Sequence, residues 1–98
     1  MSAFFIATSR IKDPQKFAEY GAKAGPTLAP FGGELVLKGK AMQTLAGTSA
    51  HQAVGIIRFA NMEALENWYH SDAYQAIIPL REQAVEMTLV TYQQPKSD

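Results

Sequence analysis

The sequence contains no cysteine and no excess of charge of either sign. Without cysteine among its 98 residues, disulfides, thiolate nucleophiles, Cys-ligated zinc sites and iron–sulfur clusters are excluded. Nine Lys and Arg residues balance nine Asp and Glu residues, and these charges are scattered along the chain. Because binding to nucleic acid or to anionic lipid depends on a basic patch, we expect neither a nucleic acid nor a membrane as a partner.

Long apolar runs are also missing. The longest is Ala3–Ala7, far short of the ~20 residues that span a bilayer. The N-terminus has neither a charged segment nor a long apolar stretch, so we expect no secretory signal and a soluble, cytoplasmic protein. Repeats, low-complexity tracts and linkers are absent too. This predicts one domain over residues 1–98, with a frayed polar tail at Pro95–Asp98.

Short segments rich in β-branched and aromatic residues predict four strands. They lie at Ala3–Ile11, Glu34–Lys40, His51–Phe59 and Glu86–Gln93. In the second segment, regular alternation places Leu35 and Leu37 on one face and Lys38 on the other.

Two helical regions separate these strands. The first begins at Asp13-Pro14, which combine an N-cap with a preset φ, kinks near Gly25-Pro26 and ends at about Phe31. The second is capped by Asn61 and capped again by Ser71. The order βαββαβ predicts an α+β, ferredoxin-like fold, with a four-stranded antiparallel sheet and both helical regions on one face.

Both faces of this sheet are predicted to be apolar. One face carries Phe5, Ala7, Ile57, Phe59, Met87 and Leu89, and the other carries Phe4, Ile6, Val54, Ile56, Val90 and Tyr92. Leaving the second set in water would forgo ~1.5–3 kcal/mol for each large side chain. We therefore predict a homodimer in which two sheets stack, with a cavity between the sheets or between sheet and helices.

Several motifs together resemble those of one known family. They are Asp13-Pro14, Gly32–Gly39, Arg58–Asn61, Trp68–Gln75 and Leu80-Arg81. The chain resembles a widespread bacterial family of small domains of unknown function, whose hallmark is W-Y-x-S-x-x-Y-Q. This resemblance implies the dimeric α/β-barrel fold, shared with cofactor-free monooxygenases, haem-degrading enzymes and muconolactone-isomerase-like proteins.

The resemblance also implies a set of signature positions, namely Tyr20, Gly33, Gly39, Trp68, Tyr69, Ser71, Tyr74 and Arg81. Two positions depart from the family pattern. Thr8 stands about where relatives carry an arginine, and Arg58 stands in a segment where relatives carry an acidic residue before F-P-S. A site that relies on those two residues in relatives would be altered in this chain.

Seven residues are candidates for lining a ligand pocket: Tyr20, Arg58, Trp68, Tyr69, His70, Tyr74 and Arg81. Each also has a purely structural interpretation. The aromatic residues at helical spacing suit a core, and Arg58 suits an ion pair at the rim of the dimer interface. Arg81 either binds an anion or pairs with Glu82 or Glu86, and Ser71 is better suited to capping a helix than to acting as a nucleophile.

The two histidines, His51 and His70, lack the spacing of a metal site, so no metal is expected. His70 would be a haem ligand only if this chain followed its haem-degrading relatives, and a solvated histidine at a helix end is the simpler interpretation, so we expect no cofactor. The sequence therefore predicts a dimeric protein that binds a small apolar or anionic molecule. The alternative is a cofactor-independent monooxygenase or isomerase, which needs a buried acid–base group facing a cavity.

Overall fold

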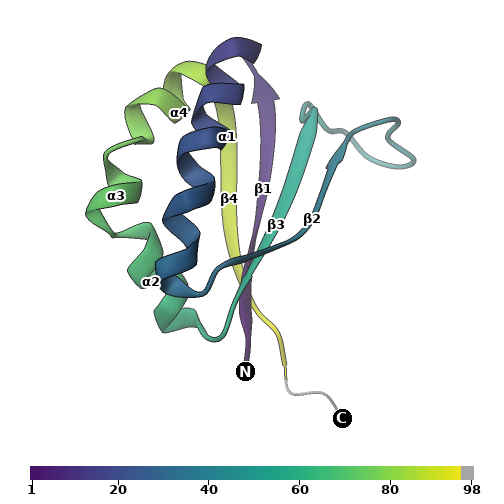
Figure 1. Cartoon of the computed structure of the whole chain (residues 1–98). Helices are drawn as coiled ribbons and strands as arrows, with labels where there is room; N and C mark the ends of the chain where they lie inside the picture. The colour runs from purple at the N-terminus through teal and green to yellow at the C-terminus, as the bar shows by residue number, and fades with distance from the viewer. Residues whose placement is uncertain (96–98) are drawn as a thin grey trace.

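The structure is a computed structural model that describes residues 1–95 (Figure 1). Its elements in chain order are β1 (Ala3–Ile11), α1 (Pro14–Leu28), the 3-10 helix η1 (Ala29–Phe31), β2 (Glu34–Lys40), β3 (Ala53–Phe59), α2 (Met62–Tyr69), α3 (Asp72–Gln75), α4 (Ile78–Ala84) and β4 (Val85–Gln93). The predicted tail beyond Pro95 lies outside the described residues.

The four strands form one antiparallel sheet in the order β2-β3-β1-β4. Within residues 1–95, the helices cover one face of the sheet and none lies on the other face (Figure 1). The predicted ferredoxin-like α+β fold is confirmed. The register also confirms the two predicted strand faces, because Phe5 pairs with Ile57 and Ile6 pairs with Ile56. The face that carries Phe5 is called the inner face below, and the face that carries Ile6 the outer face.

The prediction for the second strand is wrong in one respect. A β-bulge at Val36 interrupts the alternation, so that Leu35 lies opposite Ile57 on the inner face whereas Leu37 lies opposite Ile56 on the outer face. The bulge also turns Lys38 to the inner face, opposite Gly55. The third strand begins at Ala53 rather than His51, although the Gln52 N–H still donates to the Ser9 carbonyl of β1 and the Gln52 carbonyl accepts from the Ala41 N–H just after β2.

The first helical region begins as predicted. The Asp13 carboxylate accepts hydrogen bonds from the Gln15 and Lys16 backbone N–H groups at 3.1 Å. The helix continues through Pro26 to Leu28 rather than restarting there. The 3-10 turn that follows ends at Gly32, whose φ of 74° suits glycine.

The second helical region consists of three short helices. The Asn61 side chain accepts a hydrogen bond from the Ala64 N–H at 2.8 Å, and the Ser71 hydroxyl accepts one from the Tyr74 N–H at 3.3 Å, so both predicted caps are present. Ser71 also donates to the Trp68 carbonyl at 2.6 Å, which closes the end of α2. The region therefore bends around the inner face in steps.

The core lies between the inner face and the helices. Trp68 stacks on Phe5, with ring centroids 5.0 Å apart, and packs against Phe59 at 5.8 Å. A Cβ at Gly33 would lie 2.9 Å from the Phe59 ring, so the chain entering β2 can pass the core only as glycine. No helix within the described residues is both long and apolar enough to cross a membrane.

Candidate functional site

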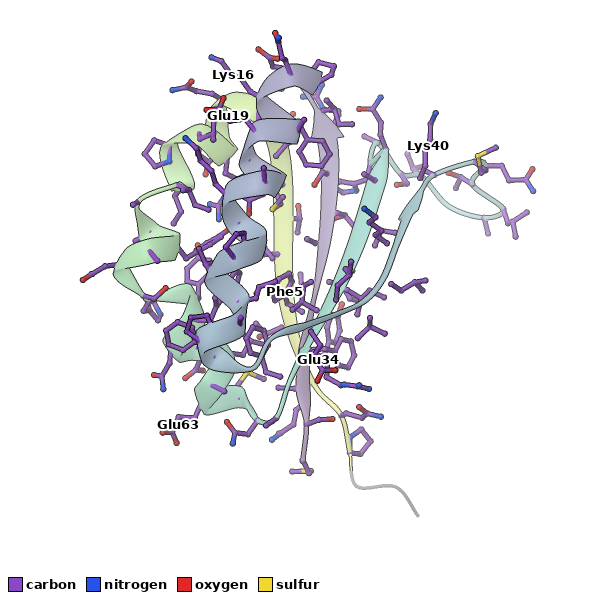
Figure 2. All side chains as sticks on the ribbon, in the orientation of Figure 1. Phe5, Lys16, Glu19, Glu34, Lys40 and Glu63 are labelled. Atoms are coloured by element: carbon purple, nitrogen blue, oxygen red, sulfur yellow. The ribbon has the colours of Figure 1, made fainter. Side chains whose placement is uncertain are left out.

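A large open cleft lies between α1 and the inner face of the sheet, with a volume of about 650 Å³. Figure 2 shows Phe5 between α1 and the strands, while Lys16 and Glu19 lie near the start of α1, away from β2 and β3. The cleft is bordered on both sides by residues with little or no side chain: Ala18, Gly21, Ala24 and Gly25 on α1, and Ala7, Gly39, Ala53 and Gly55 on the sheet.

These small residues are the reason that the cleft is open. A Cβ added at Gly21, Gly25 or Gly55 would meet no heavy atom within 4 Å. Most protein interiors are packed without voids of this size, because an unfilled space forfeits dispersion contacts on its walls. The sequence thus keeps a space open at positions where larger side chains would fit.

One end of the cleft is aromatic. Trp68, the single tryptophan of the chain, lines it together with Phe5 and Ile57. The indole Nε1 donates a hydrogen bond to the Thr27 hydroxyl at 2.9 Å, which fixes the orientation of the ring. The aromatic end is therefore rigid and apolar.

The polar side chains that line the cleft are few. They are Ser9, Tyr20 and Lys38, and the lining contains no carboxylate and no imidazole. Ser9 is 3% exposed, and within residues 1–95 its hydroxyl makes no side-chain hydrogen bond. The cleft thus combines a mainly apolar wall with one cation, Lys38, and two hydroxyl groups.

Tyr20 belongs to a buried network between α1 and the C-terminal helices. Its hydroxyl lies 2.7 Å from that of Tyr74, and the Arg81 Nη1 donates to the Tyr74 hydroxyl at 3.1 Å. Burial, followed by the adjacent Tyr74, raises the pKa of Tyr20 well above its ordinary range. Burial alone would lower the pKa of Arg81, but hydrogen bonds to Tyr69, Tyr74 and Glu82 outweigh it and raise the pKa.

We expect the stability of the protein to fall as the pH rises above about 10. Below that pH, Tyr20 is protonated in both the folded and the unfolded chain. Above it, the unfolded chain releases the Tyr20 proton while the folded chain keeps it, so the free energy of unfolding decreases by up to ~1.4 kcal/mol per pH unit. Urea unfolding between pH 8 and 11 measures this slope, which should be shallower in Tyr20→Phe and retained in Tyr92→Phe. An equal slope in all three proteins would contradict the assignment.

A second, smaller pocket lies between α2 and β4. It has a volume of about 230 Å³, and its lining includes Tyr69, His70 and Glu66. This volume is below the ~300 Å³ at which ordinary ligand sites begin. His70 is exposed at the end of α2, and the pocket beside it is small. Within residues 1–95, no three His, Asp or Glu side chains gather as a metal site.

The structure separates the predicted site residues into four places. Tyr20 and Trp68 line the cleft, Trp68 also lines the smaller pocket with Tyr69 and His70, and Tyr74 and Arg81 lie in the buried network. Arg58 lies on the outer face and pairs with Glu34 at 3.4 Å, and its place at the rim of a dimer interface stays a prediction. The pairing predicted for Arg81 is with Glu82, at 3.0 Å.

Sequence reasoning missed two cleft residues, Ser9 and Lys38. Ser9 shares the spacing of Phe5 and Ala7, so the alternation of the first strand contained a signal for it. Lys38 had no such signal, because only the bulge at Val36 brings it to the inner face.

The chain matches one known protein family over nearly its whole length. Residues 2–94 match a family described as a domain of unknown function, DUF1330. The chain belongs to the DUF1330 family. This agrees with the resemblance noted from the motifs, whereas the W-Y-x-S-x-x-Y-Q stretch as the signature of DUF1330 remains a prediction. No curated protein matches the chain.

Solved structures resemble this DUF1330 chain over nearly its whole length. A protein of unknown function from Rhodopseudomonas palustris is 20% identical, with a TM-score of 0.84, over 98% of this chain and 84% of that one. SnoaB, a cofactor-independent oxygenase from Streptomyces nogalater, is 10% identical, with a TM-score of 0.72, over 98% and 95%. A dimeric ferredoxin-like protein of unknown function from Thermobifida fusca is 13% identical, with a TM-score of 0.68, over 96% and 92%. These similarities establish the fold.

Proposed function

We propose that this protein binds a small, mainly apolar molecule in the cleft between α1 and the sheet. The observation that carries the proposal is the cleft itself, whose volume of about 650 Å³ falls within the ~300–1,000 Å³ of small-molecule sites. Trp68 and Phe5 form a rigid apolar wall at one end, and the small residues leave room beside them.

Binding without catalysis fits this lining better than a cofactor-independent oxygenase or isomerase does. Those reactions require a general acid or base within reach of the bound molecule. No His, Asp or Glu lines the cleft, and the hydroxyl of Tyr20 already bonds to Tyr74. We therefore favour a binding protein over the enzymatic alternative.

We further propose that the protein is a cytoplasmic homodimer in which the outer faces of the two copies stack. A row of apolar residues crosses all four strands of that face, in the order Leu37, Ile56, Ile6, Val90. Two ion pairs lie on the same face on either side of this row. Arg58 of β3 pairs with Glu34 of β2, and Arg10 of β1 pairs with Glu86 of β4. Equal numbers of opposite charges let two copies meet without net repulsion. The Thermobifida fusca protein of similar fold is described as dimeric, which supports a dimer here.

Titration with 11-bromo-1-undecanol tests the cleft as a binding site. Bromine quenches indole fluorescence at short range, and Trp68 is the single tryptophan of the chain and lines the cleft. We expect saturable quenching with a Kd of about 1–100 µM, an affinity of ~5–8 kcal/mol. Free N-acetyltryptophanamide is the control and should show only weak, linear quenching. A protein titration that is equally weak and linear up to the solubility limit would refute the proposal.

A further inference from the structure

We propose that the molecule bound in the cleft is an amphipathic acid, whose apolar body lies along the aromatic end and whose carboxylate is held by Lys38 and Ser9. This inference rests on the proposed function, because it specifies the ligand of the same cleft.

Lys38 supplies the charge. It is the only charged side chain that lines the cleft, and no carboxylate among the lining residues neutralises it. It reaches the inner face because the bulge at Val36 shifts the register by one residue; with regular alternation Lys38 would lie on the outer face. Bulges of this kind commonly redirect a side chain toward a functional site. The irregularity of β2 therefore has a defined effect, which is to place a cation over an apolar cleft.

Ser9 supplies a hydrogen-bond donor. It is 97% buried, since 3% of it is exposed, yet its hydroxyl makes no side-chain hydrogen bond within residues 1–95. Within residues 1–95, every side-chain oxygen that is completely buried has a hydrogen-bond partner. Since the Ser9 hydroxyl has none, it is not completely buried, and it opens into the cleft that Ser9 lines. A ligand in the cleft can therefore accept a hydrogen bond from this hydroxyl.

The two groups lie on opposite sides of one strand. Ser9 on β1 is opposite Ala53 of β3, and Lys38 on β2 is opposite Gly55, the next inner-face residue along β3. Since neighbouring strands are ~4.8 Å apart, the backbones of β1 and β2 are separated by about 10 Å here. Between Ser9 and Lys38, the β3 residues Ala53 and Gly55 have little or no side chain and so leave space in the cleft. A lysine side chain is long enough to extend from β2 across Gly55 toward Ser9, so that one carboxylate can contact both the ammonium group and the hydroxyl.

The chemistry selects an anion over a neutral polar group. A carboxylate accepts hydrogen bonds from both the ammonium and the hydroxyl, and charge-assisted bonds are roughly twice as strong as neutral ones. An alcohol or amide of the same length would leave the Lys38 charge unpaired when the apolar body fills the cleft. A cationic ligand would be repelled.

A matched pair of probes tests this inference. At pH 8, 11-bromoundecanoate and 11-bromo-1-undecanol differ only in the terminal group, and both report through quenching of Trp68. Kept below micellar concentrations, the acid should bind about 10-fold more tightly than the alcohol, the ratio expected for one net charge-assisted hydrogen bond. Lys38→Met should abolish this preference while changing the alcohol affinity less than twofold, and Ser9→Ala should reduce the preference about threefold.

Lys23→Met is the control. Lys23 lies on α1, pairs with Glu19 at 3.2 Å and does not line the cleft, so this variant should keep the full preference. Equal binding of acid and alcohol to the unmodified protein would overturn the inference and leave the proposed function intact. A preference that survives in Lys38→Met would also overturn it. If neither probe quenches Trp68 saturably, the proposed function itself fails.

Discussion

Replacing Gly55 with leucine should abolish binding of the bromoalkyl probes and make the protein more stable. A Cβ at Gly55 meets no heavy atom within 4 Å, and the position faces the cleft beside Ala7. A leucine there extends into the space that a ligand would occupy. It adds apolar contacts to the cleft wall and removes the entropic cost of glycine in a strand, which is ~0.5–1 kcal/mol.

The expected gain of ~1 kcal/mol corresponds to a rise in Tm of ~4–8 °C for a domain of this size. Probe affinity should fall at least ~100-fold, the equivalent of ~2.8 kcal/mol. Calorimetry and Trp68 quenching measure the two effects. Ala22→Leu, at an exposed position of α1 outside the cleft, is the control and should retain binding. Undiminished binding to Gly55→Leu would show that the probes bind elsewhere.

Replacing Val90 with lysine should convert the dimer into a monomer that remains folded. Val90 ends the apolar row that crosses the outer face, and it is 42% exposed in the single protomer. In a monomer a lysine at this position extends into water at little cost. In a stacked dimer the same ammonium group is buried against apolar side chains without a partner, which costs several kcal/mol.

Sedimentation velocity at micromolar concentration measures this effect. The unmodified protein should sediment as a dimer, and the dissociation constant of Val90→Lys should be at least ~100-fold weaker, equivalent to ~2.8 kcal/mol. Ala73→Lys adds the same charge to an exposed position on α3 and should leave the dimer intact. A monomeric unmodified protein, or a Val90→Lys dimer of undiminished affinity, would contradict the stacking of outer faces.

Local patterns were sufficient to predict most of the fold. Two-residue alternation identified both sheet faces, and the side chains of Asp13, Asn61 and Ser71 cap helices as predicted because capping depends on neighbours within three residues. The bulge at Val36 was not predictable in the same way. The bulge depends on how β2 pairs with β3. A two-residue alternation of apolar and polar residues cannot indicate where one extra residue is inserted.

The site was predictable only in part for a similar reason. Tyr20 and Trp68 were identified by residue type, and both line the cleft. The bond between the Tyr20 and Tyr74 hydroxyls joins residues 54 positions apart, so only the packing of α1 on the later helices creates it. The cleft itself exists because small residues on α1 and on the sheet face one another. A sequence does not show that small residues on two separate elements will lie opposite each other.

Because β2 is an edge strand of the sheet, its free edge bears on whether the protein aggregates. All seven of its residues are exposed, and a free strand edge can recruit further chains into fibrils. Here the edge is interrupted by the irregular step at Val36 and carries the ammonium groups of Lys38 and Lys40. A neighbouring copy cannot continue the ladder there in register and would bring like charges together, so the protein is protected against endless side-by-side polymerisation.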